Sequence, residues 1–476
     1  RYFIPFRLPQ ETISYLSSYP EDALLVFADD GEKFGVWPWT FKWVYKEKWL
    51  EKFWQEIENN NIKMLLPKEA IEERKPKKLI YLPTCSYREM DEWTLFLEGG
   101  KIYNKLTKML KTTNIYDKCK PFISGGMWRN FLSKYEESNN MNKRCLYAVE
   151  KYKNRPQKKA LDYILQAQCN DAYWHGVFGG LYLPHLRDAV YRNIIQGENI
   201  LGLGQESKTI VKDIDKDGYN EAVIENKYYS LYIKPRYGAA LYEWDIRERT
   251  FNIQNTLKRY KELYHEKLSY AKEKKDHQSI HQQIITKEKG LKNYLIYDRR
   301  YRYSFIEHLT SNIDGEMVYT DNFKSQTTYN FCSSVKKTDS SLTFLSPLYQ
   351  IEKTYTLDDK KIIIHYEIGK TNDIFFFVEL NLTLLTDKDR YFTIDEKRYP
   401  MNYKGSFSSI QCFTLLDEWQ DIKLNFEIHA DRFITAPIYT VSLSEAGFEK
   451  LYQETTFMIG WKLPFKPKDI IVEGTW

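Results

Sequence analysis

The residues best suited to chemistry near the start of the chain form an acidic and aromatic segment, residues 28–37 (ADDGEKFGVW). Asp29, Asp30 and Glu32 follow a short apolar run typical of a buried parallel strand, and barrel enzymes place catalytic groups at such strand ends. Glycoside hydrolysis needs a carboxyl that protonates the leaving oxygen. Adjacent acids point in different directions, so one can face a site while the other packs, and Trp37 offers stacking surface. A turn whose aspartates cap the next helix explains the same residues equally well.

A second cluster, residues 168–180 (QCNDAYWHGVFGG), ends a predicted helix with polar and aromatic side chains and then glycines. Asp171 is suited to bind a pair of sugar hydroxyls, and Trp174 to stack against a sugar ring. We assign no role to His175, because a lone histidine is more often structural than a ligand. A zinc site built on Cys169, Asp171 and His175 is disfavoured, since it lacks a fourth ligand.

A third segment, residues 213–221 (DIDKDGYNE), carries oxygen ligands in the order of a calcium-binding loop. Asp213, Asp215 and Asp217 take loop positions one, three and five, a glycine follows at six, and Glu221 stands at nine. The glutamate that an EF-hand requires at position twelve is absent, and so are helical flanks. The segment therefore resembles the shorter calcium loops between strands, although an acidic hairpin turn explains it slightly better.

The elements that must position these segments fall into three predicted regions. Residues 1–105 alternate short apolar runs with helical stretches, as β/α units do, but hold too few units to close a barrel of about 250 residues. Residues 106–205 predict a helix bundle, and period-two patterns over residues 206–476 predict a large antiparallel β-sandwich. A charged helical stretch, residues 256–287, interrupts the sandwich and is expected on the solvated surface. The fold class is thus α/β plus all-β.

Composition excludes several classes of function. Seventy Lys and Arg against 65 Asp and Glu leave a net charge of +5 that is spread along the chain, which disfavours a nucleic-acid partner. No run approaches about 18 apolar residues, so we expect no membrane span. The six cysteines are scattered without a C-x-x-C pair, which favours reduced thiols and a cytoplasmic location. The chain begins at Arg1, so the lack of a signal peptide carries no weight.

Two of the chemical segments resemble conserved regions of glycoside hydrolase family 57. Residues 28–37 resemble its fourth region and residues 168–187 its fifth, and the stretches at 81–93, 125–132 and 213–237 also fit. The nearest subgroup is that of the 4-α-glucanotransferases and related α-amylases. The resemblance implies a retaining mechanism in an incomplete (β/α)₇ barrel, here only its C-terminal part, followed by a helix bundle and a β-sandwich. It assigns the general acid/base to Asp30 and places four residues in the glucan subsites: Glu32, Trp37, Asp171 and Trp174.

The departures from the family pattern shape the functional prediction. The first three conserved regions, including the segment with the nucleophilic glutamate, are not in this chain. We therefore expect an α-glucan or maltooligosaccharide enzyme that is inactive by itself and active with a separate or joined N-terminal half. The alternative is a non-catalytic carbohydrate-binding or structural remnant. No residue decides between hydrolysis and transfer, no organic cofactor is expected, and any calcium would be structural.

Overall fold

The computed structural model describes twelve stretches of the chain, which together form two compact units, Arg1–Pro83 and Thr84–Trp476. The described stretches are residues 3–37, 39–74, 78–82, 86–176, 179–270, 286–322, 326–327, 334–347, 350–369, 374–444, 447–464 and 466–476.

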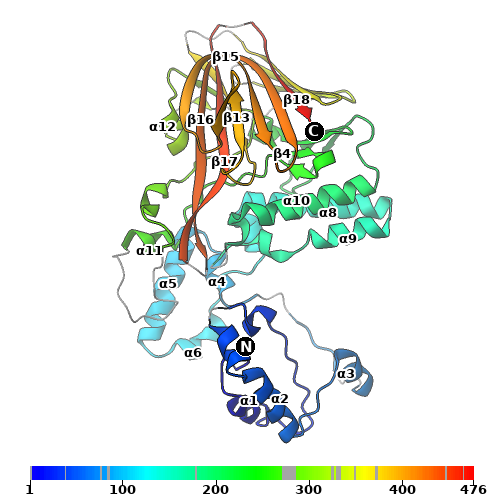
Figure 1. Cartoon of the computed structure of the whole chain (residues 1–476), viewed down its shortest axis with the longest axis vertical. Helices are drawn as coiled ribbons and strands as arrows, with labels where there is room; N and C mark the ends of the chain where they lie inside the picture. The colour runs from blue at the N-terminus through cyan, green and yellow to red at the C-terminus, as the bar shows by residue number, and fades with distance from the viewer. Residues whose placement is uncertain are drawn as a thin grey trace. The chain divides into compact units, whose positions relative to one another are not determined.

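The first unit consists of short helices joined by extended segments (Figure 1). The helices are α1 (Pro9–Leu16), η1 (Gly31–Phe34), η2 (Lys42–Lys46), α2 (Trp49–Asn59) and α3 (Pro67–Glu73). Its small core forms because Trp49, Phe53 and Ile57 recur at four-residue spacing along α2 and pack against Ile13 of α1. The indole N–H of Trp49 also donates to the carbonyl of Arg7 at 2.6 Å, which fixes the chain before α1.

The parallel strand predicted before the acidic segment is not formed, and the described residues of this unit contain no strand, so the barrel remnant is not confirmed. Instead the apolar run is exposed to solvent, with Val26 at 85% and Phe27 at 54% exposure. A second run is equally bare, with Leu79 at 102% and Tyr81 at 89%. A strand of a parallel sheet needs neighbours to bond its backbone and cover both faces, and the described part of this unit supplies none.

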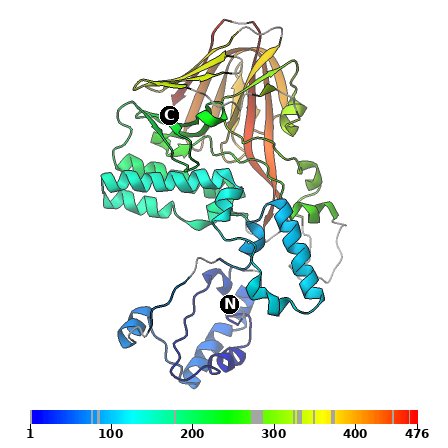
Figure 2. The same ribbon diagram turned by 180° about the vertical axis from the view of Figure 1, so that it is seen from behind.

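The second unit begins with a helical region, in which α8, α9 and α10 lie side by side (Figures 1 and 2). The successive helices are α4 (Met90–Trp93), α5 (Leu97–Thr112), α6 (Tyr116–Cys119), η3 (Lys120–Phe122), α7 (Asn130–Lys134), α8 (Glu136–Asn154), α9 (Lys158–Gln166), η4 (Asn170–Tyr173), η5 (Gly180–Tyr182) and α10 (Pro184–Ile200). Throughout the described residues, every helix is too short or too polar to cross a lipid bilayer. The division into three domains stays a prediction.

Two antiparallel sheets follow the helices, as the period-two patterns predict. The smaller has the order β1-β2-β3-β4-β5 and is formed by β1 (Lys208–Lys212), β2 (Glu221–Glu225), β3 (Tyr229–Lys234), β4 (Ala240–Ile246) and β5 (Phe251–Asn252). The larger has 13 strands. These are β6 (Ile306–Thr310), β7 (Gln326–Thr327), β8 (Ser334–Lys337), β9 (Ser341–Ser346), β10 (Ile351–Asp358), β11 (Lys361–Glu367), β12 (Phe375–Leu382), β13 (Tyr391–Ile394), β14 (Lys397–Pro400), β15 (Gly405–Asp417), β16 (Ile422–Ser444), β17 (Gly447–Lys462) and β18 (Lys468–Thr475).

One apolar core joins the two sheets. It contains Leu231 and Trp244 of the smaller sheet together with Ile364, Phe426 and Phe457 of the larger one, all fully buried. Alternation produces this core: β10 and β11 bury every second residue, so that one face of each strand turns inward. Short helices interrupt the strands: η6 (Pro235–Tyr237), η7 (Arg247–Arg249), α11 (His265–Tyr270), η8 (Leu291–Tyr294) and α12 (Gly315–Thr320).

The prediction that residues 256–287 form a solvated surface helix is wrong for the part that the structure describes before residue 271. Arg259 and Glu262 are only 2% and 3% exposed. Arg259 pairs with Asp298 at 2.6 Å, and Glu262 accepts hydrogen bonds from the hydroxyls of Tyr135 at 2.7 Å and Tyr182 at 2.9 Å. The charges are buried because partners distant in sequence neutralise them. Residues 271–285 lie outside the described part of the chain.

A buried charge network fastens the helical region to the smaller sheet. Arg144 of α8 is 1% exposed and makes two hydrogen bonds to Glu198 of α10, at 2.6 and 2.8 Å. It also donates to Glu243 of β4 at 2.7 Å. Burial pushes the pKa of Glu198 upward, but Arg144 and Lys151 outweigh it and hold that pKa below its usual value. Burial and the neighbouring Glu243 raise the pKa of Asp245 well above its usual value.

Candidate functional site

The structure separates the two adjacent aspartates of the acidic segment. Asp29 turns inward: its side chain is 9% exposed, forms a close ion pair with buried Lys33 and accepts the backbone N–H of Asp30 at 3.0 Å. Asp30 turns outward, with 55% of its side chain exposed, and its carboxylate lies 3.8 Å from the Lys33 ammonium. Asp30 stands at the N-cap position of η1, but its side chain makes no capping hydrogen bond. Of the two acids, Asp30 is therefore the one that a substrate can reach.

The rest of this segment forms a tight turn. The carbonyl of Glu32, whose side chain is exposed, accepts the backbone N–H groups of Val36 at 2.9 Å and Trp37 at 3.0 Å. Gly35 has a φ of +135°, which residues with a side chain rarely adopt, so the turn requires glycine there. Trp37 is half-buried and stacks on Phe6 with ring centroids 5.9 Å apart. The segment thus presents Asp30, Glu32 and a fixed indole together.

The second cluster presents Asp171 beside a fixed pair of indoles. Asp171 is exposed on η4, and the indole N–H of half-buried Trp174 donates to the side-chain oxygen of Asn170 at 2.9 Å. The Trp174 ring lies parallel to that of Trp93, with centroids 5.9 Å apart and planes 2° apart. Trp93 carries no predicted role, because nothing in its own segment of the sequence connects it with Trp174.

Close packing explains the glycines of this cluster. A Cβ atom on Gly176 would lie 2.4 Å from the Trp93 ring, and one on Gly180 would lie 2.1 Å from the Trp174 carbonyl oxygen. Gly180 also has a φ of +53°. A glycine at position 176 was therefore a sequence signal that a large side chain, here that of Trp93, packs against this segment.

Replacing Gly176 with alanine is expected to displace the Trp93 ring and destabilise the second unit by about 1–3 kcal/mol. The reason is steric, because the added methyl group needs the space that the indole occupies. Urea unfolding and the near-ultraviolet circular dichroism of the indoles measure the effect. Gly99→Ala in α5 is the matched control, since its Cβ would meet only Leu95 atoms at 3.8 Å, an ordinary contact. Equal stability of the two variants would contradict the packing argument.

His175 is a structural residue, in agreement with the absence of an assigned role. It is 1% exposed, its Nδ1 lies 2.5 Å from the Gly179 carbonyl oxygen, and its Nε2 lies 2.6 Å from the Tyr264 hydroxyl. Burial lowers its pKa to about 4, so the ring is neutral at physiological pH. A buried ring with both nitrogens engaged cannot join Cys169 and Asp171 as a zinc ligand.

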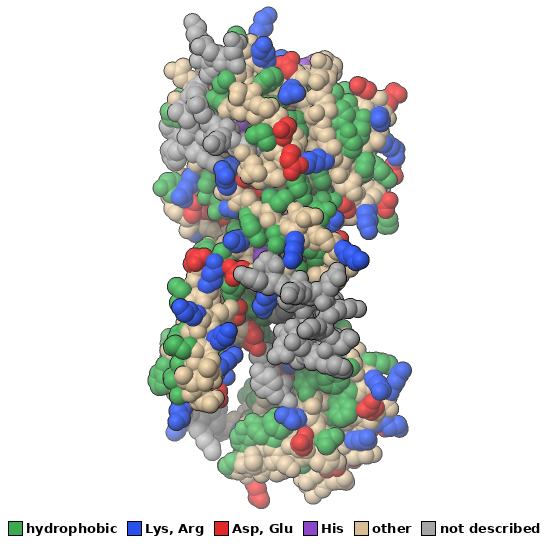
Figure 3. All heavy atoms as spheres, turned by 90° about the vertical axis from the view of Figure 1, so that its left-hand side faces the viewer, with side chains coloured by type: hydrophobic (Ala, Val, Ile, Leu, Met, Phe, Trp, Pro, Cys, Tyr) green, Lys and Arg blue, Asp and Glu red, His purple; other side chains and the backbone are tan. Residues whose placement is uncertain are grey.

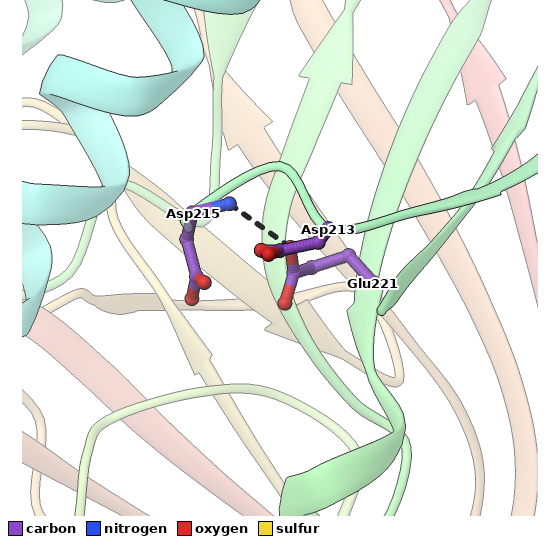
Figure 4. Close-up of side chains that lie close together, drawn as sticks. All are labelled: Asp213, Asp215 and Glu221. Atoms are coloured by element: carbon purple, nitrogen blue, oxygen red, sulfur yellow. Dashed lines mark hydrogen bonds between the residues drawn. The ribbon is translucent and has the colours of Figure 1, made fainter. Parts of the chain in front are cut away.

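The acidic loop between β1 and β2 brings three of its four carboxylates together (Figure 4). Ligand atoms of Asp213, Asp215 and Glu221 all lie within 4.8 Å of one another, the one such group of His, Cys, Asp or Glu within the described residues. Glu221 is 2% exposed and accepts the backbone N–H of Asp215 at 3.0 Å. Burial and the charge of Asp215 raise the pKa of Glu221 to about 7. Asp217 instead pairs with Arg236 at 2.9 Å.

Comparison with known families accounts for most of the chain. Residues 1–83 match glycosyl hydrolase family 57, residues 126–201 match the middle domain of alpha-amylase/4-alpha-glucanotransferase, and residues 213–471 match the C-terminal domain of the same proteins. The chain belongs to glycoside hydrolase family 57. Within that family it falls in the α-amylase/4-α-glucanotransferase group, so the resemblance seen in the sequence is confirmed.

Individual relatives agree with this family 57 assignment. Alpha-amylase 1 of Dictyoglomus thermophilum is 38% identical over 504 aligned residues, which cover 100% of this chain and 72% of the relative. The 4-alpha-glucanotransferase of Thermococcus kodakarensis is 33% identical over 96% of this chain and 70% of its own length. The crystal structure of 4-alpha-glucanotransferase from Thermococcus litoralis matches with a TM-score of 0.79 at 30% identity, covering 100% of this chain and 71% of that chain.

Proposed function

We propose that this family 57 chain supplies the general acid/base and part of the glucan subsites of a retaining enzyme that acts on α-1,4-glucans, a 4-α-glucanotransferase or α-amylase. The observation that carries the proposal is the outward carboxylate of Asp30 beside the inward, paired carboxylate of Asp29. The names of the relatives support the substrate class. They include both activities, so hydrolysis and transfer are proposed jointly.

Each candidate residue has a role in this mechanism. Asp30 protonates the departing glycosidic oxygen and then deprotonates the acceptor, which is water in an amylase and a sugar 4-hydroxyl in a transferase. Glu32 and Asp171, both exposed, accept hydrogen bonds from glucose hydroxyls. Trp37 and Trp174 offer indole faces to the C–H faces of the sugar rings.

The second carboxylate of the retaining pair is proposed to come from polypeptide outside these residues. A retaining pair stands about 5–5.5 Å apart across the scissile bond, and Glu32 follows Asp30 on the same turn, so Glu32 is not that group. The bare apolar runs at residues 24–27 and 79–82 support the proposal, because they are suited to bind further strands. We propose that the polypeptide that carries the nucleophile covers them.

The test joins this chain to the part of the Dictyoglomus thermophilum relative that it does not match, and incubates the product with maltooligosaccharides. Longer and shorter products together indicate transfer, and shortening alone indicates hydrolysis. The chain by itself is expected to give neither. Full activity of the chain alone would contradict the proposed division of the catalytic pair.

A non-catalytic glucan-binding protein is the second candidate. The observation in its favour is that Asp30 is exposed to solvent, while its neighbouring acids are unsuited to be the second carboxylate: Asp29 pairs with Lys33, and Glu32 lies on the same turn. If the joined protein is folded and binds maltooligosaccharides but leaves them intact, this candidate replaces the enzyme.

A structural calcium ion is proposed at the loop between β1 and β2. Asp213, Asp215 and Glu221 would hold it, and Asp213 carries a buried carboxylate oxygen that has no hydrogen-bond partner. Carboxylate oxygens are the ligands that Ca²⁺ prefers. The chemistry supplied would be structural, a charge that draws three carboxylates together. Asp217 is left out of the proposed ligand set because it is not among the carboxylates that lie within 4.8 Å of one another, and it pairs with Arg236. One oxygen of Asp215 pairs with Lys234 at 2.6 Å, so its other oxygen would bind the ion.

Calcium is expected to raise the unfolding temperature of the wild type by roughly 2–5 °C, since it binds only the folded loop. Asp213→Asn is expected to abolish the rise. Asp217→Asn, a change in the same loop, is expected to keep it. Scanning fluorimetry with excess Ca²⁺ and with EDTA provides the measurement. A rise of the same size in the Asp213 variant would exclude the proposed site.

A further inference from the structure

We propose that the turn between β15 and β16, which carries Trp419, is a second saccharide-binding site on the surface of the β-sandwich. It shares no residue with the Asp30 and Asp171 segments. The saccharide class follows from the geometry and charge of the turn, and the choice of an α-1,4-glucan as its ligand rests on the proposed function.

Trp419 is exposed and yet firmly positioned. Trp419 stands on a turn of the sandwich and is 73% exposed. The buried carboxylate of Asp417 accepts the backbone N–H groups of Trp419 at 3.0 Å and Gln420 at 3.1 Å. The Gln420 side chain donates to Asp417 at 3.1 Å and accepts a close hydrogen bond from Arg192 of α10. A single exposed indole is common on protein surfaces, but a backbone held this firmly has already lost the freedom that binding would otherwise cost.

One face of the Trp419 ring is open. The guanidinium carbon of Arg390 lies 5.6 Å from the ring centroid and covers the other face. An indole covered on both faces could not keep 73% of its surface exposed. A pyranose ring presents a patch of C–H groups, which stack on an open aromatic face while the hydroxyl groups at the ring edge remain hydrogen-bonded.

The surroundings of the ring are polar but balanced in charge. Arg390 lies 3.4 Å from Asp417, and Arg398 lies 3.0 Å from exposed Glu418. Two further arginines around this turn are also paired: Arg192 with Asp188, and Arg249 with Asp421. Acidic and basic side chains are also interspersed over the face of the sandwich that Figure 3 shows. A nucleic acid needs a surplus of positive charge, whereas a neutral polyol needs donors and acceptors beside an apolar face. This turn offers hydrogen-bond donors and acceptors beside an apolar face, which is the arrangement that suits a neutral polyol.

Native electrophoresis through gels containing amylopectin tests the site. The full chain is expected to be retarded, and Trp419→Ala is expected to lose most of the retardation, an affinity about tenfold weaker or more. Trp54→Ala is the matched control, because Trp54 is 45% exposed on α2 of the other unit. Quenching of tryptophan fluorescence by β-cyclodextrin should likewise be strong in the wild type and in Trp54→Ala and weak in Trp419→Ala. Circular dichroism of the Trp419 variant must match that of the wild type.

Three results would overturn the proposal: retardation of Trp419→Ala equal to wild type, no retardation of any form, or Trp419-dependent binding of a single-stranded oligonucleotide in place of the glucan. The proposed function is judged separately, by cleavage of short maltooligosaccharides in the joined protein. There Trp419→Ala is expected to leave the rate on maltotetraose unchanged and to slow the reaction on amylopectin. If retardation is insensitive to Trp419 while maltotetraose is still converted, the surface site fails and the catalytic proposal stands.

Discussion

Asp30→Asn is expected to lower the rate of maltooligosaccharide conversion by the joined enzyme about 10²–10⁴-fold. An amide cannot donate the proton that the leaving sugar needs, and it cannot accept the proton of the incoming water or hydroxyl. Since the Asp30 side chain is 55% exposed and makes no capping bond, the substitution should leave the unfolding temperature unchanged. A substrate with a 4-nitrophenolate leaving group needs little protonation, so its release in the first turnover should be affected far less.

Asp29, the neighbouring acid, provides a control, because its substitution should lower stability and leave turnover intact. Asp29→Asn removes the buried ionic partner of Lys33, whose side chain is 3% exposed, so it should lower stability while the remaining folded molecules keep their turnover. Initial rates and melting curves on both variants distinguish the two roles. Loss of turnover in the Asp29 variant with full activity in the Asp30 variant would reverse the assignment. Full activity in both would end the assignment of the general acid/base to this segment.

Arg144→Met is expected to be the most destabilising single change, by about 3–5 kcal/mol. The side chain is similar in length, but the charge that compensates Glu243, and that compensates Glu198 together with Lys151, is lost. Both carboxylates are fully buried, and a second oxygen of Glu243 already lacks a hydrogen-bond partner. Urea unfolding at pH 7 measures the loss, with Arg129→Met as the control because Arg129 is exposed near the start of α7.

The stability lost in the Arg144→Met variant should be larger at neutral pH than at acidic pH. In the wild type the pKa of Glu198 is lowered, so its contribution is present above the unfolded pKa, about 4.3, and is lost as the pH falls through the lower folded value. In the variant, Lys151 still lies 3.0 Å from Glu198, but Arg144 no longer opposes burial, so the pKa of Glu198 rises from its lowered value and that of Glu243, which burial already raises in the wild type, rises further. Glu243 then folds protonated below about pH 4.3, and the variant loses stability as the pH rises through the raised folded pKa of Glu243. A deficit that shrinks toward neutral pH would contradict this account.

Local patterns in the sequence determined much of this protein. Period-two patterns predicted β3, β11, β12 and the start of β16. β11 and the start of β16 bury every second residue, as a strand with one solvated face does, whereas β3 and β12 are buried almost throughout. Helical spacing predicted the region from α8 to α10 in the same way. The acidic segment, the cluster around Asp171 and the family were also readable, because residue order and type carry them without any knowledge of contacts.

Only the tertiary structure decided which residues share a site or a core. Residue type and spacing left Asp29 and Asp30 on equal terms, and only the family resemblance singled out Asp30. In the structure, Asp29 turns inward and pairs with buried Lys33. The sequence did not connect Trp93 with Trp174, since their contact joins segments far apart in the chain. It also placed Arg259 on the surface, where a charged stretch belongs unless distant partners neutralise it.

The strand predicted at residues 24–28, which the structure does not form, is a second case in which local sequence was insufficient. An apolar run predicts that a surface will be covered, but its hydrogen-bond partners and its cover come from other strands, and the described part of the first unit provides neither. Periodicity is a property of neighbouring residues and can therefore be predicted from their order. Strand pairing and the burial of charge depend on groups that only folding brings together.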